Sequence, residues 1–140
     1  MNFFSAIDIS ASGLVAQRMR MNVISENISK IDAAQENGKE PSVRKEVVLA
    51  PKDFSGIFKD AMYRPQGVEV VDIVKSKDST KMVYNPSHPY ANKDGFVEMP
   101  NINIIMEMAE MLSASRAYEA NVTAISSAKE MIIKTLEIGK

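Results

Sequence analysis

Residues 101–138, NINIIMEMAEMLSASRAYEANVTAISSAKEMIIKTLEI, predict the longest element of the fold. They contain neither glycine nor proline, and their apolar side chains recur every three or four positions, as in an amphipathic helix. The main stripe consists of Ile104, Met108, Met111, Ser115, Tyr118, Val122, Ile125, Ile132 and Leu136, and a second row of Ile105, Leu112, Ala124 and Met131 widens it. Asn101 or Asn103, after Pro100, is a suitable N-cap. At ~1.5 Å per residue this helix would be about 55 Å long, too long for a compact domain of this size.

A second amphipathic helix is predicted at the other end of the chain, from residue 3 to about residue 33. Its apolar residues are again spaced by three or four positions. The stripe consists of Phe4, Ile7, Ala11, Leu14, Met21 and Ile28, with Arg18 and Ser25 as polar members.

Between these helices the sequence has a different character. Glycine and proline punctuate residues 38–100, which excludes a long helix there. Short strands are predicted at 43–49, 68–74, 81–84 and 96–99, with a tight turn at Asp94-Gly95. The expected fold class is therefore mainly α with a small β lobe (α+β), in which two long helices pack as a coiled-coil-like pair beside a hairpin-rich middle. The expected segments are 1–37, 38–100 and 101–140.

The predicted helices carry more apolar surface than this chain can cover. The middle segment is too small to bury both helices, and pairing the helices with each other would leave the second row exposed. Because exposed apolar surface marks interaction sites, we expect burial across chains. The residues expected at that interface are Leu14, Met21, Ile28, Met108, Met111, Tyr118, Asn121, Val122, Ile125 and Ile132. The alternative is a self-contained helical hairpin with a β insertion.

An isolated chain should then have loosely ordered terminal helices. Their ordering on assembly would be offset by burial between subunits.

Composition excludes several classes of function. The formal net charge is −1 with no basic block, which argues against nucleic-acid binding. There is no cysteine and His88 is the only histidine, so a metal site is not expected. The carboxylates of the C-terminal helix lie mostly off its apolar stripe, and no Gly-x-Gly loop is present. We therefore expect no catalytic site, no cofactor and no enzymatic activity.

The N-terminal segment does not have the pattern of a secretory signal peptide. Its first basic residue is Arg18, and Asp8 interrupts the apolar stretch. No apolar run approaches the roughly 20 residues that cross a bilayer, so direct membrane insertion is not expected either.

Several motifs resemble the FlgC family of flagellar basal-body rod proteins. NPSHPYAN at 85–92 and GFVEMPNIN at 95–103 resemble the signature of that family, and SRAYEAN at 115–121 resembles the C-terminal hallmark of rod and hook axial proteins. GLVAQ at 13–17 and MNVISENIS at 21–29 are similar to the N-terminal rod signature. The segment Lys30-Ile31-Asp32 departs from the family pattern, which has an asparagine and a threonine-containing turn there.

The resemblance implies a structural subunit of the proximal rod that transmits motor torque. It implies export through the flagellar type III apparatus without a cleaved signal peptide, and assembly in the periplasmic part of the basal body with the terminal helices forming the inner rod wall. The implied partners are further copies of the chain, FlgB, FlgF, the distal rod protein FlgG and the adaptor FliE. The competing interpretation is a helical-hairpin adaptor or chaperone of a secretion system.

Overall fold

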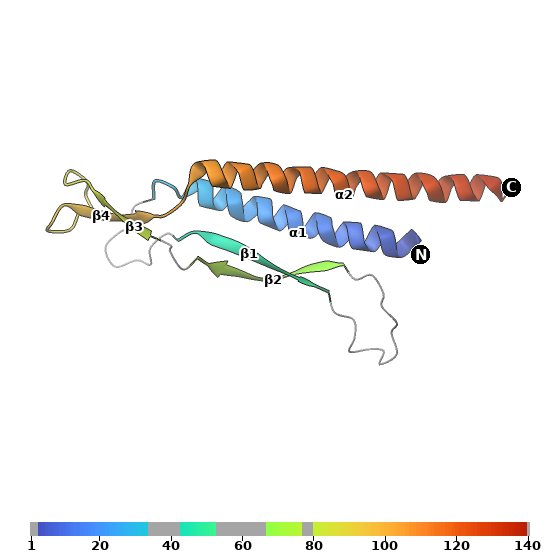
Figure 1. Ribbon diagram of the computed structural model, residues 1–140, viewed down its shortest axis with the longest axis horizontal. Coiled ribbons are helices and arrows are strands. Elements are labelled where there is room, and N and C mark those ends of the chain that lie inside the picture. The colour runs from blue at the N-terminus through green and yellow to red at the C-terminus, as the bar shows by residue number, and fades with distance from the viewer. Residues whose placement is uncertain (1–2, 34–42, 53–66, 77–79, 140) are drawn as a thin grey trace, which may run out of the picture.

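The computed structural model describes residues 3–33, 43–52, 67–76 and 80–139 (Figure 1). The elements in chain order are α1 (Phe3–Ser29), β1 (Lys45–Pro51), β2 (Val68–Lys75), β3 (Thr80–Tyr84), β4 (Phe96–Pro100) and α2 (Ile104–Ile138). The two long helices pack side by side in opposite directions, and α2 extends past the N-terminal end of α1 (Figure 1). The mainly helical α+β fold expected from the sequence is confirmed.

Helix α2 begins at an asparagine cap. The side-chain oxygen of Asn103 accepts hydrogen bonds from the backbone N–H groups of Ile105, at 3.0 Å, and Met106, at 3.4 Å. Such a cap satisfies donors that have no partner within the helix. The cap is therefore Asn103 rather than Asn101, and the helix continues for 35 residues without interruption.

Helix α1 is shorter than the sequence predicts. It ends at Ser29, and the chain then turns, with Lys30 N–H donating to the carbonyl of Asn27 at 3.1 Å and Ile31 N–H to that of Ile28 at 3.3 Å. Because these i→i+3 bonds tighten the chain, the helix does not reach residue 33. The boundary expected between residues 37 and 38 lies outside the described residues.

The described strands form two separate antiparallel hairpins. Strand β1 pairs with β2 from Lys45↔Lys75 to Pro51↔Val68, and β3 pairs with β4 from Thr80↔Pro100 to Tyr84↔Phe96. The prediction of four strands is confirmed, although β1 begins two residues later than expected.

The connection between β3 and β4 turns at Gly95. This residue has φ 81°, a conformation that glycine adopts without steric cost. The Asn92 side chain accepts from Asp94 N–H and Phe96 N–H, both at 2.9 Å. Within the same connection, His88 accepts a hydrogen bond from Tyr90 N–H at 3.2 Å, which fits a structural role.

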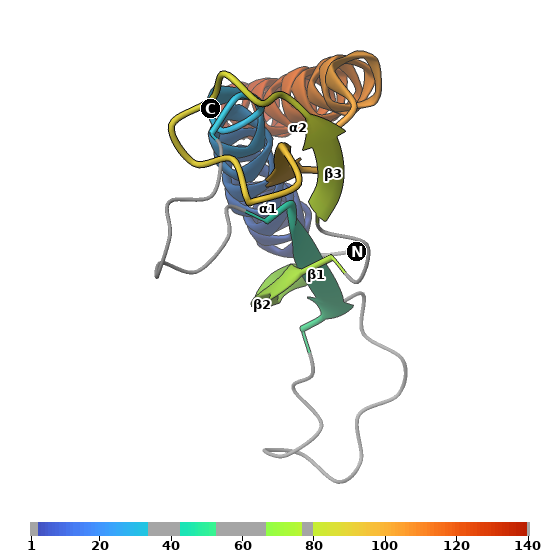
Figure 2. The same ribbon diagram turned by 90° about the vertical axis from the view of Figure 1, so that its left-hand side faces the viewer.

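Helix α1 lies between α2 and the β1–β2 hairpin (Figures 1 and 2). Its side chains are consequently half-buried over most of its circumference, whereas α2 is exposed away from α1. The buried apolar residues are Ala16, Val23, Ile24, Val97, Ile102, Ala114 and Ala128, and the buried polar residues are Asn27 and Glu107.

The contact between the helices is rotated from the predicted stripes. On α1, the stripe members Phe4, Arg18 and Ser25 are exposed. On α2, Ile104 and Leu136 are exposed, while Ala114, which belongs to neither predicted row, is buried. The predicted stripes follow the largest apolar side chains. Closely packed helices meet instead through small side chains, so the contact lies to one side of these stripes.

Candidate assembly interface

The contact line between the helices, here called the seam, repeats every seven residues on α2. On α2 we assign to it Glu107, Ala114, Asn121 and Ala128. Gly13 and Asn27 of α1 meet Asn121 and Glu107, and Ala16, Val23 and Ile24 are the buried apolar residues of the same helix. A seven-residue repeat keeps one line of side chains against a partner helix. At the centre of the seam, the backbone of α1 at Gly13 lies directly against the Asn121 side chain of α2. A Cβ added to Gly13 would lie 2.9 Å from Asn121 Nδ2.

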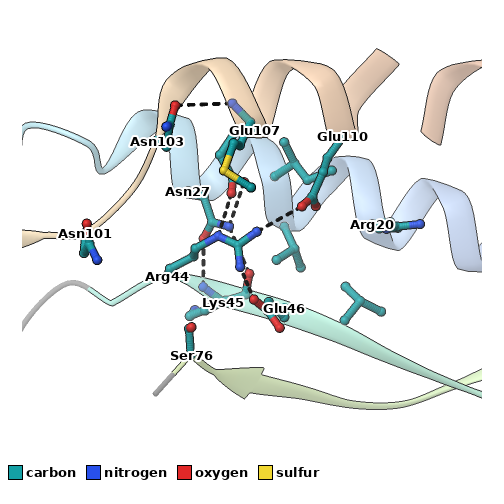
Figure 3. A pocket seen from close by; sticks show the side chains of 14 residues that line it. Arg20, Asn27, Arg44, Lys45, Glu46, Ser76, Asn101, Asn103, Glu107 and Glu110 are labelled. Carbon is teal, nitrogen blue, oxygen red and sulfur yellow. Dashed lines mark hydrogen bonds and ion pairs between the residues drawn. The ribbon is translucent and has the colours of Figure 1, made fainter. Parts of the chain in front are cut away.

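Residues around Asn27 join α1, α2 and β1 at one end of the seam (Figure 3). We call Asn27, Arg44, Lys45 and Glu107 the polar junction. Asn27 Nδ2 donates to the carbonyl of Lys45 at 2.9 Å and to Glu107 Oε2 at 3.0 Å, while Asn27 Oδ1 accepts from Lys45 N–H at 3.0 Å. The amide thus pairs with the backbone at the start of β1 as a neighbouring strand would, which fixes this end of the hairpin to α1.

The buried carboxylate of Glu107 is fully engaged. Arg44 Nε donates to Glu107 Oε1 at 2.7 Å, and the same guanidinium reaches Glu110 Oε1 at 3.2 Å and pairs with Glu46. Burial by itself lowers the pKa of Arg44, but the hydrogen bond and negative charge of Glu107, with Glu46 and Glu110, raise it above its usual value. Arg44 therefore stays charged and neutralises the one acid that is fully buried in the described chain.

A second, more exposed group of charges lies beside the junction. Lys45 Nζ bonds Glu26 Oε1 at 2.7 Å, and Lys30 pairs with the same oxygen. These hydrogen bonds, from Lys30 first and Lys45 second, lower the pKa of Glu26 below its usual 4.5. Ionised Glu26 therefore stabilises the fold above pH 4.5, and this contribution is lost as the pH falls through the lowered pKa.

Sequence reasoning did not single out the polar junction. Asn27 and Glu107 look like ordinary polar residues of amphipathic helices. The sequence does contain a signal for Glu107, however. It lies seven residues before Ala114, and the same seven-residue spacing continues through Asn121 and Ala128, as expected of residues on one side of a helix.

One side of α2 carries large apolar side chains that the described chain covers only in part. These residues, here called the outer strip, are Ile104, Met108, Leu112, Val122 and Ile133, each exposed over 44% to 60% of its surface. At ~100° per residue they lie within about 80° of one another around the helix. The outer strip runs beside the seam, so it is accessible while α1 is in place.

The residues expected at an assembly interface divide into two groups. Met108 and Val122 lie on the outer strip. The others are half-buried within the chain: Leu14, Met21, Ile28, Met111, Tyr118, Asn121, Ile125 and Ile132. Met111, Tyr118, Ile125 and Ile132 are spaced by seven and flank the seam, so part of their surface is already used in pairing with α1.

Known proteins similar to this chain share its full length. A family model described as flagellar basal body rod FlgEFG protein C-terminal matches residues 93–138. The chain is 41% identical to the flagellar basal-body rod protein FlgC of Bacillus subtilis, with 100% of both chains covered. This chain belongs to the FlgC family. The FlgC protein of Borreliella burgdorferi is 39% identical over 99% of this chain and 98% of its own, and that of Aquifex aeolicus is 37% identical over 100% and 99%.

Membership of the FlgC family makes the chain a structural subunit of the flagellar basal-body rod, which assembles with other rod components. This confirms the family expected from the sequence motifs. Among the described residues, no helix is long and apolar enough to cross a membrane, and no three potential metal ligands of the His, Cys, Asp or Glu type lie together.

Proposed function

We propose that the subunit joins the proximal rod by packing the outer strip of α2 against helices of neighbouring subunits. The observation that carries this proposal is the exposure of five large apolar side chains along one side of α2 while α1 already occupies the seam. Apolar surface of this kind, on a protein whose family builds a rod, supports a contact between subunits.

The energetics favour such a contact. Full burial of a side chain the size of leucine or methionine is worth about 1.5–3 kcal/mol, and roughly half of that remains available at each position of the outer strip. A neighbouring helix that covers the strip would therefore gain on the order of several kcal/mol. Leu14, Met21, Ile28, Met111, Tyr118, Asn121, Ile125 and Ile132 would contribute the surface that pairing of α1 with α2 leaves uncovered.

The polar junction supports a packing role rather than catalysis. A hollow of about 590 Å³ lies between α1, α2 and β1, and Glu46, Glu107 and Glu110 border it (Figure 3). All three are paired with Arg44, so the hollow contains no free pair of carboxylates of the kind that glycosidases use.

The finer placement of the subunit follows from the resemblance to FlgC proteins. We place the subunit in the periplasmic part of the basal body, where it would transmit torque. Its neighbours would be further copies of the chain and the proteins FlgB, FlgF, FlgG and FliE. The segments 1–37 and 101–140 would form the helical wall, and 38–100 the outer part. Export would leave the N-terminal segment in place, since removing 15–30 residues would delete Gly13, and removing more than 15 would also delete Ala16, from the seam.

The substitution Val122→Asp tests the proposed contact. Val122 is 44% exposed in the subunit, so the new carboxylate should leave the fold of the single chain nearly unchanged. In a packed interface the same charge would cost several kcal/mol. We expect a chain that is expressed and exported but does not support rod completion or swimming.

Glu130→Lys is the matched control on the same helix. Glu130 is exposed and already charged, and by its position around α2 it lies at the edge of the outer strip, in line with Leu112. Exchanging one exposed charge for another changes surface pairing by about 0–1 kcal/mol, so swimming should be retained. Detection of the Val122→Asp chain outside the cell interior tests whether it is exported, and its intact mass tests whether the N-terminal segment is retained. Normal swimming by the Val122→Asp strain would remove the outer strip from the interface.

A further inference from the structure

The β3–β4 hairpin has one face that no other described element covers. Side chains alternate between the two faces of a hairpin, and the register places Met82, Tyr84, Phe96 and Glu98 on the same face. Met82 is 59% exposed, Tyr84 65% and Phe96 39%, whereas Val97 on the opposite face is buried. Neither described helix nor the β1–β2 hairpin packs along these strands (Figure 1). We call Met82, Tyr84, Phe96 and Glu98 the hairpin face.

The hairpin face combines aromatic surface with a negative charge that has no partner. The rings of Tyr84 and Phe96 meet edge to face, with their centroids 5.3 Å apart. Glu98 is half-buried directly across from Met82 in the register, and it forms neither an ion pair nor a hydrogen bond through its side chain within the described ranges. This surface therefore suits a partner that brings apolar side chains together with a positive charge.

The last turns of α2, at the opposite end of the molecule, are also uncovered. Helix α2 has 35 residues and α1 has 27, and the C-terminal end of α2 extends past α1 (Figure 1). In these turns Met131 is 51% exposed and Ile138 is 86% exposed. At ~100° per residue, Met131, Lys134 and Ile138 lie within about 60° of one another, in an arc that does not overlap the outer strip. We call these three residues the terminal face.

The terminal face and the hairpin face are complementary in chemistry. Two apolar side chains and a lysine would meet aromatic and methionine side chains and a carboxylate. The Lys134 side chain is 78% exposed, and its pair with Glu137 at 3.6 Å is a weak surface pair, so Lys134 is available to another carboxylate. One chain cannot make this contact with itself, because α2 is a continuous helix about 50 Å long with the two faces at its opposite ends (Figure 1).

We infer that the hairpin face binds the last helical turns of an adjacent rod chain, whose apolar side chains pack on Tyr84 and Phe96 and whose lysine pairs with Glu98. A contact between two different surfaces at opposite ends of a subunit repeats as an open array instead of closing into a dimer. A rod is an open array of this kind. The family model that matches residues 93–138 spans both β4 and the end of α2, so a neighbouring chain of the same type brings the required turns. The inference rests on membership of the FlgC family and not on the outer strip.

Photo-cross-linking in isolated basal bodies, followed by mass spectrometry of the linked peptides, tests the docking site. A photoreactive phenylalanine derivative in place of Tyr84 keeps an aromatic ring on the hairpin face. It should give a two-chain product in which the linked peptide comes from the last helical turns of a rod chain. The same residue in place of Lys81, exposed on the other face of β3, is the control and should give several-fold less of this product.

A charge reversal tests the pairing of Glu98. In the chain with the photoreactive residue at position 84, Glu98→Lys should lower the yield of the same product several-fold, because two lysines would then face each other. Glu69→Lys is the same exchange at an exposed position of β2, and it should leave the yield unchanged. Equal yields from the two variants would contradict the pairing of Glu98 with the lysine of the terminal face.

Two results would overturn the docking site as a whole. One is that position 84 links to another segment or yields no product with these turns, and the other is that position 81 yields as much of it. If the residue at position 84 prevents rod completion, the same residue in place of Met82 decides by the same comparison. Links from the hairpin face to these turns would stand even if the Val122→Asp strain swam normally, so the two interfaces are tested separately.

Discussion

At the scale of single residues, Glu107 shows how a buried charge can be accommodated at a junction of three segments. Its side chain is fully buried, yet both carboxylate oxygens are bonded, one by Arg44 Nε and the other by Asn27 Nδ2. Its position in the first turn of α2 adds the favourable field of the helix N-terminus. Each partner comes from a different segment, so the carboxylate fixes the relative positions of α1, α2 and the start of β1.

Glu107→Gln should therefore destabilise the subunit markedly. The amide can still accept one hydrogen bond, but Arg44 loses its buried counter-charge in a site that is largely closed to water. We expect a decrease of about 2–3 kcal/mol in the free energy of unfolding, measured by urea denaturation.

Glu137→Gln supplies the comparison. It is the same substitution on the same helix, in an exposed pair with Lys134 at 3.6 Å, and should change stability by less than about 1 kcal/mol. Equal effects of the two substitutions would show that the polar junction contributes no more than a surface ion pair.

At the scale of elements, the close approach of α1 and α2 depends on small residues in the seam. Gly13 faces Asn121, whose Nδ2 donates to the carbonyl of Ala117 at 2.9 Å. A methyl group on Gly13 would displace this side chain from its bond. In a helix interior, glycine is less favourable than alanine by about 1 kcal/mol. Its presence at position 13 therefore indicates that close packing against Asn121 outweighs helix propensity at this position.

The pair Gly13 and Asn121 permits a double-mutant test of the seam. With Asn121 present, Gly13→Ala should gain little or be destabilising, because the added Cβ meets Asn121 at 2.9 Å. In an Asn121→Ala background the same change should stabilise the subunit by about 0.5–1 kcal/mol. Urea denaturation of the four chains gives the coupling energy, which we expect to be about 1 kcal/mol. A coupling near zero would place these residues out of contact.

Patterns along the sequence predicted the helices and strands, but not which side of each helix packs against its partner. The spacing of apolar residues predicted both helices, and turn residues such as Gly95 located the strands to within about two positions. The seam was not predicted because hydrophobicity gives little weight to Gly13, Ala16 and Ala114, which carry the contact through their small size. The polar junction was missed because Asn27 and Glu107 acquire their role only from Arg44 and Lys45, which lie far away in sequence.

At the scale of the whole molecule, the layers determine which surfaces remain free. Helix α1 is covered by α2 on one side and by the β1–β2 hairpin on the other (Figure 2). Among the described elements, only α1 packs along α2, with Arg44 touching its first turns, so its outer strip and the turns beyond α1 stay exposed. Of the two helices, α2 carries most of the large exposed apolar side chains. Under our proposal, the subunit meets its neighbours through this helix, whose position is already fixed by the seam.

Site-specific photo-cross-linking in isolated basal bodies tests this account most directly. A photoreactive residue in place of Met108, on the outer strip, should form a cross-link to a second rod chain. The same residue in place of Ser113, exposed on another side of α2, should do so far less. Cross-links from position 108 that stay within its own chain, or that are weaker than those from position 113, would contradict assembly through the outer strip.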